Sequence, residues 1–134
     1  MPAASGGLYG IGIDMVEIAR MERLLARQGR RALDKMMMPA ERREALQRGN
    51  LARALAMAWA AKEACAKALG TGFRDELGFR DIGVQRAANG RPSLVFSAAQ
   101  RKRLRALGVG VAHLSLTDEA GMACAYVVLE RAAL

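Results

Sequence analysis

The 134-residue sequence has few aromatic residues, two cysteines and no long hydrophobic run. Aromatic side chains make up 4% of it, and no basic, glycine-rich strand motif of the single-strand RNA binders is present. Cys65 and Cys124 are too few and too isolated for a disulfide framework or a zinc site, so we interpret both as structural. No run of about 18 uncharged apolar residues occurs, and Met1–Gly7 lacks the features of a secretory signal. We therefore expect a cytoplasmic protein with no membrane partner.

The sequence also lacks the phosphate-binding loops of the common nucleotide-binding folds. Gly10-Ile11-Gly12 has no third glycine, so it is not the fingerprint of a dinucleotide-binding loop. The glycine-rich loop that ends in lysine and a hydroxyl residue is absent from the whole sequence. Ordinary ATP and dinucleotide chemistry are therefore disfavoured.

Positive charge is what the sequence has in excess. Its 21 lysines and arginines against 13 acidic residues give a formal net charge of +8. Such a charge predicts attraction to a polyanion, which can be a nucleic acid, a phosphate-rich small molecule or an acidic protein. Charge alone does not choose among the three, and a basic nucleic-acid-binding module is the alternative to an enzyme.

Hydrophobic periodicity and turn signals divide the chain into short strands and helices. The length fits one domain, which we place at residues 8–134 after a flexible tail at residues 1–7. Helices interspersed with hairpins predict an α+β domain with antiparallel strand pairing. The predicted strands are Leu8–Ile13, Leu77–Arg86, Ser93–Phe96, Val111–Thr117 and Met122–Glu130; the predicted helices are Met15–Gln28, Pro39–Arg48, Leu51–Leu69 and a basic helix from Ser97 to Leu107.

The first predicted helix has two stripes of side chains. One is apolar and recurs at three and four residues, as in a helix that packs on a core. The other consists of arginines and lies about a third of a turn or more away. The apolar stripe is Ile18, Met21 and Leu25, and the basic stripe is Arg20, Arg23, Arg27 and Arg31.

The helix predicted at Leu51–Leu69 carries charge on its apolar face. Lys62 falls in the middle of this face, and Glu63 and Lys67 lie at its edge. A charge near a packed face needs an ionic partner, a metal or a phosphate, because burying it alone is costly. The alternative is that Lys62 extends to solvent and Glu63 pairs with Lys67, which is worth about 0.3 to 0.5 kcal/mol. Spacing alone favours the alternative.

Asp14 and His113 each allow a structural and a functional interpretation. Asp14 follows the first strand, so its carboxylate either faces a metal or caps the next helix, and capping is the commoner role. His113 shares a strand face with Ser115 and Thr117 and points toward polar surroundings. A lone histidine on a strand is more often a hydrogen-bonded structural residue. Neither residue alone fixes a reaction.

Two segments of the chain form recognisable motifs: Gly10–Arg20 reads GIGIDMVEIAR, and residues 59–72 read WAAKEACAKALGTG. The first resembles the G-x-G-x-D-[IM]-[VT]-E-[IL]-x-R opening, and the second the F-A-x-K-E-A-x-x-K-A-x-G-T-G signature, of the holo-[acyl-carrier-protein] synthase family of small bacterial phosphopantetheinyl transferases. The likeness continues through Phe79–Ile82, Asn89–Pro92 and His113–Glu130. It implies a phosphopantetheinyl transferase fold, with an antiparallel sheet packed against a long central helix, and a trimer with active sites between subunits.

The resemblance also implies a reaction, in which 4'-phosphopantetheine moves from coenzyme A to a serine of an acyl carrier protein. Asp14 and Glu63 would hold Mg²⁺ against the coenzyme A diphosphate, which reverses the capping and ion-pair interpretations. Two carboxylates suffice because Mg²⁺ fills its other positions with water and substrate oxygens. Lys67, with Lys62 as a second candidate, would bind the diphosphate and stabilise the leaving nucleotide. A carboxylate acting through water would be the base.

Binding residues follow from the same resemblance. The acidic recognition helix of an acyl carrier protein would dock on the arginine helix, and coenzyme A would contact segments from the second half of the chain. The implied partner-binding residues are Arg20, Met21, Arg23, Leu24 and Arg27. The implied coenzyme A-binding residues are Lys62, Lys67, Gly70, Gly72, Asn89, Gly90, Pro92 and His113.

The chain departs from the family's pattern at several positions. Ala58 stands where relatives usually have arginine, so a coenzyme A phosphate contact is lost or is supplied by Arg53. Asp118 stands where some relatives have a second histidine. A nucleic-acid-binding module would tolerate the loss of either carboxylate, and its affinity would fall steeply with salt. An inactive carrier-protein-binding relative would not need the carboxylates and lysine that this chain retains.

Overall fold

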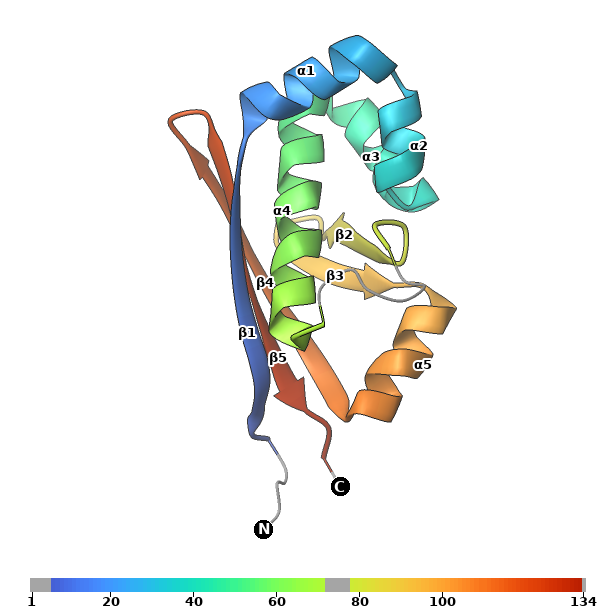
Figure 1. Cartoon of the computed structure of the whole chain (residues 1–134), viewed down its shortest axis with the longest axis vertical. Helices are drawn as coiled ribbons and strands as arrows, with labels where there is room; N and C mark the ends of the chain where they lie inside the picture. The colour runs from blue at the N-terminus through green and yellow to red at the C-terminus, as the bar shows by residue number, and fades with distance from the viewer. Residues whose placement is uncertain (1–5, 72–77, 134) are drawn as a thin grey trace.

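The computed structural model describes residues 6–71 and 78–133 (Figure 1). Residues 1–5 of the predicted tail, Gly72 and the predicted strand start at Leu77 lie outside the described residues. Gly7 is tied to the last strand, because its carbonyl accepts a hydrogen bond from Arg131 N at 2.7 Å. The elements in chain order are β1 (Leu8–Glu17), α1 (Ile18–Gln28), α2 (Arg31–Met36), α3 (Pro39–Arg48), α4 (Leu51–Leu69), β2 (Ile82–Arg86), β3 (Pro92–Phe96), α5 (Ala98–Leu107), β4 (Val109–Glu119) and β5 (Met122–Arg131).

The strands form two antiparallel sheets, which confirms the predicted α+β class. The larger sheet has the order β1-β5-β4, and β2 and β3 form a separate two-stranded sheet. α4 runs along one face of the larger sheet and packs mainly on β1 and β5 (Figure 1). α1, α2 and α3 gather at one end of α4, and α5 lies toward the other. The predicted packing of an antiparallel sheet against a long central helix is therefore present.

Capping residues define both ends of α4, as the sequence predicts. The Asn50 side chain accepts a hydrogen bond from Arg53 N at 3.0 Å and so caps the first turn. Gly70 ends the helix with φ of 81°, a left-handed conformation that favours glycine. Leu55 and Cys65 are fully buried, and the many alanines let other elements approach the helix backbone closely. α4 is therefore the centre of the hydrophobic core.

β1 is longer than the sequence predicts. It continues through Asp14 to Glu17, and α1 begins at Ile18 rather than at Met15. The extension comes from pairing with β5, where Asp14 lies opposite Ala125. Glu17 holds the N-cap position of α1. Asp14 is therefore a strand residue, and the interpretation of Asp14 as a helix cap is wrong.

The face of the larger sheet that points away from α4 carries exposed apolar side chains. Successive side chains of a strand point to opposite faces. Ile11, Ile13 and Met15 therefore point away from the face that carries Gly10, Gly12 and Asp14. Ile11, Ile13 and Met15 on β1 are 55%, 56% and 58% exposed, and Tyr126 on β5 is 42% exposed. We call these four residues the outer sheet face. Exposed apolar side chains gathered on one face make that face a candidate interaction surface.

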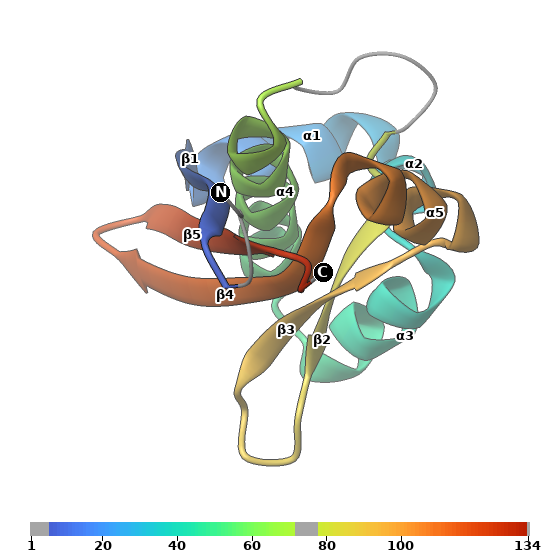
Figure 2. The ribbon, with the colours of Figure 1, turned by 90° about the horizontal axis from the view of Figure 1, so that it is seen from below.

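Both predicted hairpins form, but β2 begins at Ile82, so residues 78–81 are not part of the strand as predicted. Asn89 and Gly90 make the turn between β2 and β3, and this hairpin extends away from the larger sheet in Figure 2. Ala120 and Gly121 join β4 to β5, and both have positive φ, of 53° and 77°. Ser97 caps α5 by accepting a hydrogen bond from the backbone N–H of its third helical residue.

Within the described residues, no helix combines the length and apolarity needed to cross a lipid bilayer.

Candidate active site

Two glycines let β1 lie directly against the backbone of α4. A Cβ added at Gly10 would lie 2.0 Å from the carbonyl oxygen of Ala68. One added at Gly12 would lie 1.9 Å from the carbonyl oxygen of Ala64. Only residues without a side chain can approach a helix so closely. The next inward residue of β1 is Asp14, so this packing places its carboxylate beside the polar edge of α4.

Asp14 and Lys67 contact each other directly. Lys67 Nζ lies 3.1 Å from Asp14 Oδ1 and donates a second hydrogen bond to the carbonyl oxygen of Ile13 at 2.9 Å. The Lys67 side chain is 56% exposed, whereas that of Asp14 is 16% exposed. An ion pair with one partner this exposed contributes only about 0 to 1 kcal/mol. Lys67 could therefore exchange Asp14 for another anion at little cost.

Glu63 lies one turn before Lys67 on α4 and completes a cluster. Partial burial raises the pKa of its carboxyl, and the negative charge of Asp14 raises that pKa further. The positive charges of Lys67 and Arg20 oppose this increase. Two neighbouring carboxylates attract a cation, which would offset the repulsion that Glu63 experiences beside Asp14. We call Asp14, Glu63 and Lys67 the carboxylate cluster.

A groove lies beside the cluster, between α1, α2 and α4. Arg20 Cζ is 4.8 Å from the centre of the Trp59 ring, and the Phe79 ring stacks on Trp59 with centroids 4.9 Å apart. The groove has a volume of about 350 Å³. Its apolar lining is Met21, Leu24, Met36, Trp59 and Phe79, and its basic lining is Arg20, Arg27 and Lys35. Apolar walls with three cations fit an amphipathic, acidic ligand.

A second hollow, of about 260 Å³, lies near the N-terminal end of α4. Arg48, Arg53 and Arg86 line it together with Ala58. Arg53 Nη2 is 2.7 Å from Asp118 Oδ1, which ties this end of α4 to β4. Burial lowers the pKa of Arg86, the charges of Arg48 and Arg53 lower it further, and the charge of Glu44 opposes them. Glu41 and Glu44 also line the hollow, so carboxylates partly compensate its three guanidinium groups.

Comparisons with known proteins identify the family and the fold of this chain. The sequence matches the family model of the 4'-phosphopantetheinyl transferase superfamily over residues 10–126. The holo-[acyl-carrier-protein] synthase of Alkalilimnicola ehrlichii is 48% identical over 124 residues, which are 92% of this chain and 97% of that protein. The chain belongs to the holo-[acyl-carrier-protein] synthase family. The resemblance seen in the sequence is therefore confirmed.

Solved structures of the synthase family have the same fold. That of the Neisseria meningitidis holo-[acyl-carrier-protein] synthase matches with a TM-score of 0.88 at 39% identity, covering 92% of this chain and 99% of that one. That of the Helicobacter pylori synthase in complex with coenzyme A has a TM-score of 0.77 at 32% identity, covering 89% and 98%. The α+β arrangement described above is therefore the fold of this family.

The basic stripe and its neighbours differ from the prediction in two respects, and the first is that Arg31 begins α2 and does not lie on α1. Arg20, Arg23 and Arg27 are exposed on α1, and Leu24 is half-buried. Met21 is 1% exposed, so it supports the groove from the core and offers almost no surface to a partner. The expectation that Met21 forms part of the carrier-protein contact surface needs this correction.

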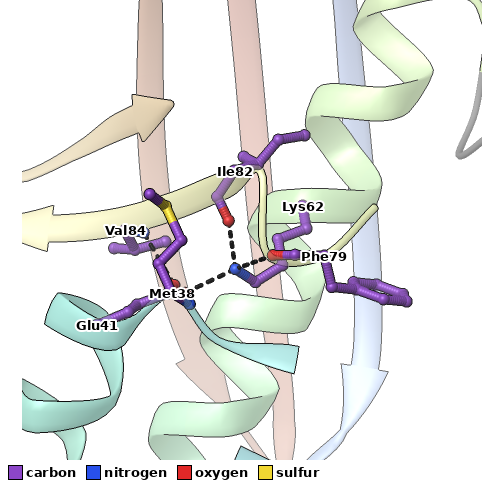
Figure 3. Close-up of polar contacts among 6 residues, drawn as sticks. All are labelled: Met38, Glu41, Lys62, Phe79, Ile82 and Val84. Carbon is purple, nitrogen blue, oxygen red and sulfur yellow. Dashed lines mark hydrogen bonds and ion pairs between the residues drawn. The ribbon is translucent and has the colours of Figure 1, made fainter. Parts of the chain in front are cut away.

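Lys62 also departs from its predicted place in the synthase site. Its side chain is 0% exposed, so it does not extend to solvent. Its ammonium group donates hydrogen bonds to Glu41, to the carbonyl oxygen of Phe79 and to the carbonyl oxygen of Ile82 (Figure 3). A lysine ammonium has three protons, and all three are used. We therefore leave Lys62 out of the coenzyme A site.

His113 lies on the opposite face of the larger sheet from Asp14. Asp14 is opposite the buried Ala125, whereas His113 is opposite Val128 on the outward side. The His113 ring interacts with Glu130 and is exposed. Within one chain, His113 therefore cannot join the carboxylate cluster.

The remaining residues expected to bind coenzyme A are distributed over two regions. Gly70 ends α4, close in sequence to Lys67. Asn89 and Gly90 are at the far end of the β2–β3 hairpin, and Pro92 begins β3. Gly72 lies outside the described residues. One chain brings Gly70 to the side of the cluster but keeps the hairpin turn apart from the larger sheet.

Sequence reasoning missed the partners that surround the signature segment. It gave no role to Glu41 beyond the first turn of its helix, and it did not connect Phe79 with Trp59. A partial signal exists, because Pro39 and Glu41 are typical of a capped helix start. Nothing in the local pattern links Glu41 to a lysine 21 residues later on α4.

Proposed function

We propose that this chain transfers 4'-phosphopantetheine from coenzyme A to a serine of apo-acyl carrier protein, producing holo-acyl carrier protein and adenosine 3',5'-bisphosphate. The carboxylate cluster is the observation that carries the proposal. Its members come from the two segments that resemble the family, and the close packing of β1 on α4 brings them together. Curated relatives named holo-[acyl-carrier-protein] synthase support the reaction.

Asp14 and Glu63 would hold Mg²⁺ in this reaction. The donor set fits, because Mg²⁺ prefers hard carboxylate oxygens and needs few of them from the protein. The raised pKa of Glu63 beside Asp14 fits as well, since a cation would offset the repulsion between the two groups. In the described part of the chain, no group of three or more His, Cys, Asp or Glu side chains could hold a metal. When bound, the ion would neutralise charge on the diphosphate.

Lys67 would bind the diphosphate of coenzyme A. Its ammonium is exposed and is held in place by Asp14 and the Ile13 carbonyl oxygen. The serine oxygen forms a bond to the β-phosphorus while the bond from phosphorus to the nucleotide's phosphate oxygen breaks. Negative charge then grows on the leaving nucleotide, where a fixed cation is most stabilising. The serine proton leaves through water to a carboxylate of the cluster.

The acyl carrier protein would dock along α1. Exposed Arg20, Arg23 and Arg27 supply positive charge to an acidic helix, and half-buried Leu24 supplies apolar surface. The groove beside Trp59 continues this surface and combines an apolar lining with cations. Such a surface fits an acidic amphipathic helix better than it fits a uniform polyanion. This match also favours the carrier protein over the alternative of a nucleic acid.

Coenzyme A would find further cations in the second hollow. An arginine is usual at position 58 in this family, and Ala58 here lines a hollow that already holds Arg48, Arg53 and Arg86. These guanidinium groups would compensate for the missing arginine in binding a phosphate. Arg53, which the sequence suggests for this role, is shared with Asp118.

A homotrimer would complete the site. His113 and the Asn89 turn cannot meet the cluster within one chain, whereas a neighbouring subunit could supply them. The outer sheet face, Ile11, Ile13, Met15 and Tyr126, provides apolar surface for such an interface. The cytoplasmic location expected from the sequence belongs to the same proposal.

Mass spectrometry of an apo-acyl carrier protein tests the function. The carrier is incubated with this protein, coenzyme A and Mg²⁺, beside samples with EDTA and with the Glu63→Gln variant. The proposal expects a gain of the phosphopantetheine mass that both controls abolish. No gain with several carrier proteins would contradict the transferase function and leave a basic binding domain. A gain that survives EDTA would contradict the metal's role alone.

A further inference from the structure

Lys62, the buried lysine of the signature segment, has a complete set of hydrogen-bond partners. It lies near the groove between α1, α2 and α4, which we call the carrier-protein groove. Lys62 is among the largest fully buried side chains of the protein. Its Nζ lies 2.6 Å from Glu41 Oε1 and 2.8 Å from the Phe79 carbonyl oxygen, and it also donates to the Ile82 carbonyl oxygen. Figure 3 shows these acceptors converging on the ammonium from α3, the segment before β2, and β2 itself.

Both carboxylate oxygens of Glu41 accept hydrogen bonds from the backbone. Glu41 is 6% exposed, and its Oε1 also accepts a hydrogen bond from Met38 N at 3.1 Å. Its Oε2 accepts one from Val84 N at 2.8 Å. The two charges compensate each other, and every acceptor of the ammonium is fixed by backbone structure. Such a pair specifies one arrangement of its neighbours, because removing either charge leaves the other buried and unpaired.

The pair is connected to the groove through Phe79. Lys62 holds the main-chain carbonyl of Phe79, and the Phe79 ring stacks on Trp59 at 4.9 Å with an angle of 28° between the planes. The Trp59 ring in turn lies under the guanidinium of Arg20, at 4.8 Å. Phe79, Trp59 and Arg20 all line the groove. The ammonium therefore fixes one wall of the surface on which the carrier protein would dock.

We propose that Lys62, paired with Glu41, is a positioning residue that shapes the carrier-protein groove through Phe79 and makes no contact with coenzyme A. The inference rests on the proposed function, since it assigns the groove to an acyl carrier protein. It differs from the role that the sequence implies, in which this lysine is a ligand of the diphosphate. The two roles predict opposite kinetic effects. A diphosphate ligand sets KM for coenzyme A, whereas a groove-positioning residue sets KM for the carrier protein.

Steady-state kinetics of three variants separates these roles. Lys62→Met combined with Glu41→Gln removes both buried charges, Phe79→Leu removes only the ring, and Lys102→Met is a matched loss of an exposed lysine on α5. All variants are assayed well below the unfolding temperature of the least stable one. The first two should each raise KM for the carrier about three- to tenfold, the range expected for loss of an aromatic stacking contact. KM for coenzyme A should not rise in either variant, because the Glu41→Gln change removes only a negative charge from the wall of the second hollow. Lys102→Met should change neither KM.

Combining the changes tests whether Lys62 acts through Phe79. Adding Phe79→Leu to the charge-free pair should raise KM for the carrier no further, because the ring position is already lost. Independent, multiplying effects would overturn the proposal. A rise in KM for coenzyme A with an unchanged KM for the carrier would overturn it as well and make Lys62 a diphosphate ligand.

Fluorescence gives a measurement that does not depend on turnover. Trp59 is the only tryptophan, and its ring is stacked on Phe79. The charge-free pair should make Trp59 more accessible to acrylamide, as Phe79→Leu does, while Lys102→Met should not. Unchanged quenching in the charge-free pair would overturn the positioning role. If the unmodified protein transfers nothing, the proposed function fails, and quenching still decides whether Lys62 positions Phe79.

Discussion

Gly12 lies where β1 crosses α4 with no room for a side chain. In a Gly12→Ala variant, the new Cβ would lie 1.9 Å from the carbonyl oxygen of Ala64 and 2.7 Å from Ala68 N. A Cβ atom makes ordinary contacts with other heavy atoms at 3.4 Å or more, so strand and helix would have to move apart by roughly 1.5 Å. Both contacts are with backbone atoms, which cannot rotate away as a side chain can.

That movement should lower both the stability of the fold and the rate of transfer. Overpacking a well-packed site costs about 1 to 3 kcal/mol, and a rigid backbone contact puts Gly12→Ala at the upper end, about 3 kcal/mol. For a domain of this size, such a loss lowers Tm by about 10 to 15 °C. Asp14 is two residues further along β1, so it moves away from Glu63 and Lys67. A displacement of about 1 Å costs roughly a hundredfold in rate.

Thermal unfolding measures the loss of stability and the transfer assay measures the loss of rate, with Gly7→Ala as the matched control. A Cβ at Gly7 would meet only the Arg131 Cδ atom, at an ordinary 3.7 Å, so this variant should unfold and react like the unmodified protein. The reasoning is refuted if Gly12→Ala keeps the Tm and the transfer rate of the control. The close approach of β1 would then not be what positions Asp14.

Three further predictions concern the site and its surroundings. Glu63→Gln should abolish transfer yet stabilise the metal-free protein by under about 1 kcal/mol in free energy of unfolding. Because the pKa of folded Glu63 lies above its unfolded value of 4.5, this gain should be present at neutral pH and vanish below that value, as a series of Tm measurements against pH would show. Arg23→Glu should raise KM for the carrier about tenfold at low salt and less at high salt, whereas Lys102→Glu should not. Ile13→Glu with Tyr126→Glu should give monomers in sedimentation equilibrium, and an unmodified protein that is already monomeric contradicts the trimer.

Elements with strong local signals could be predicted from the sequence. α4 has the predicted bounds, Leu51–Leu69, because its Asn50 cap and its terminal Gly70 act within a few residues of the helix. The end of β1 could not be predicted in this way. Asp14 looks like a cap when only its neighbours are considered, and the strand continues because β5, more than a hundred residues later, supplies its hydrogen-bonding partners.

The same limit applies to the candidate site. The helical pattern correctly placed Lys62 on a packed face, and the need for a partner follows from the cost of burying charge. It could not identify the partner, since Glu41 lies on another helix and Phe79 on a segment beyond α4. Recognition of the signature assigned Lys62 and Lys67 similar roles, but one is buried and the other exposed. Only tertiary structure separates two lysines that are five residues apart.

Through its alternation of side chains, β1 would connect the proposed chemistry with the proposed trimer. Gly10, Gly12 and Asp14 face α4, where the absence of side chains on the first two sets the position of the third. Ile11, Ile13 and Met15 belong to the other face and are more than half exposed. A neighbouring subunit seated on that face would press β1 against α4 and so hold Asp14 near Glu63. Loss of the interface should therefore weaken catalysis even in a protomer that keeps every residue of the cluster.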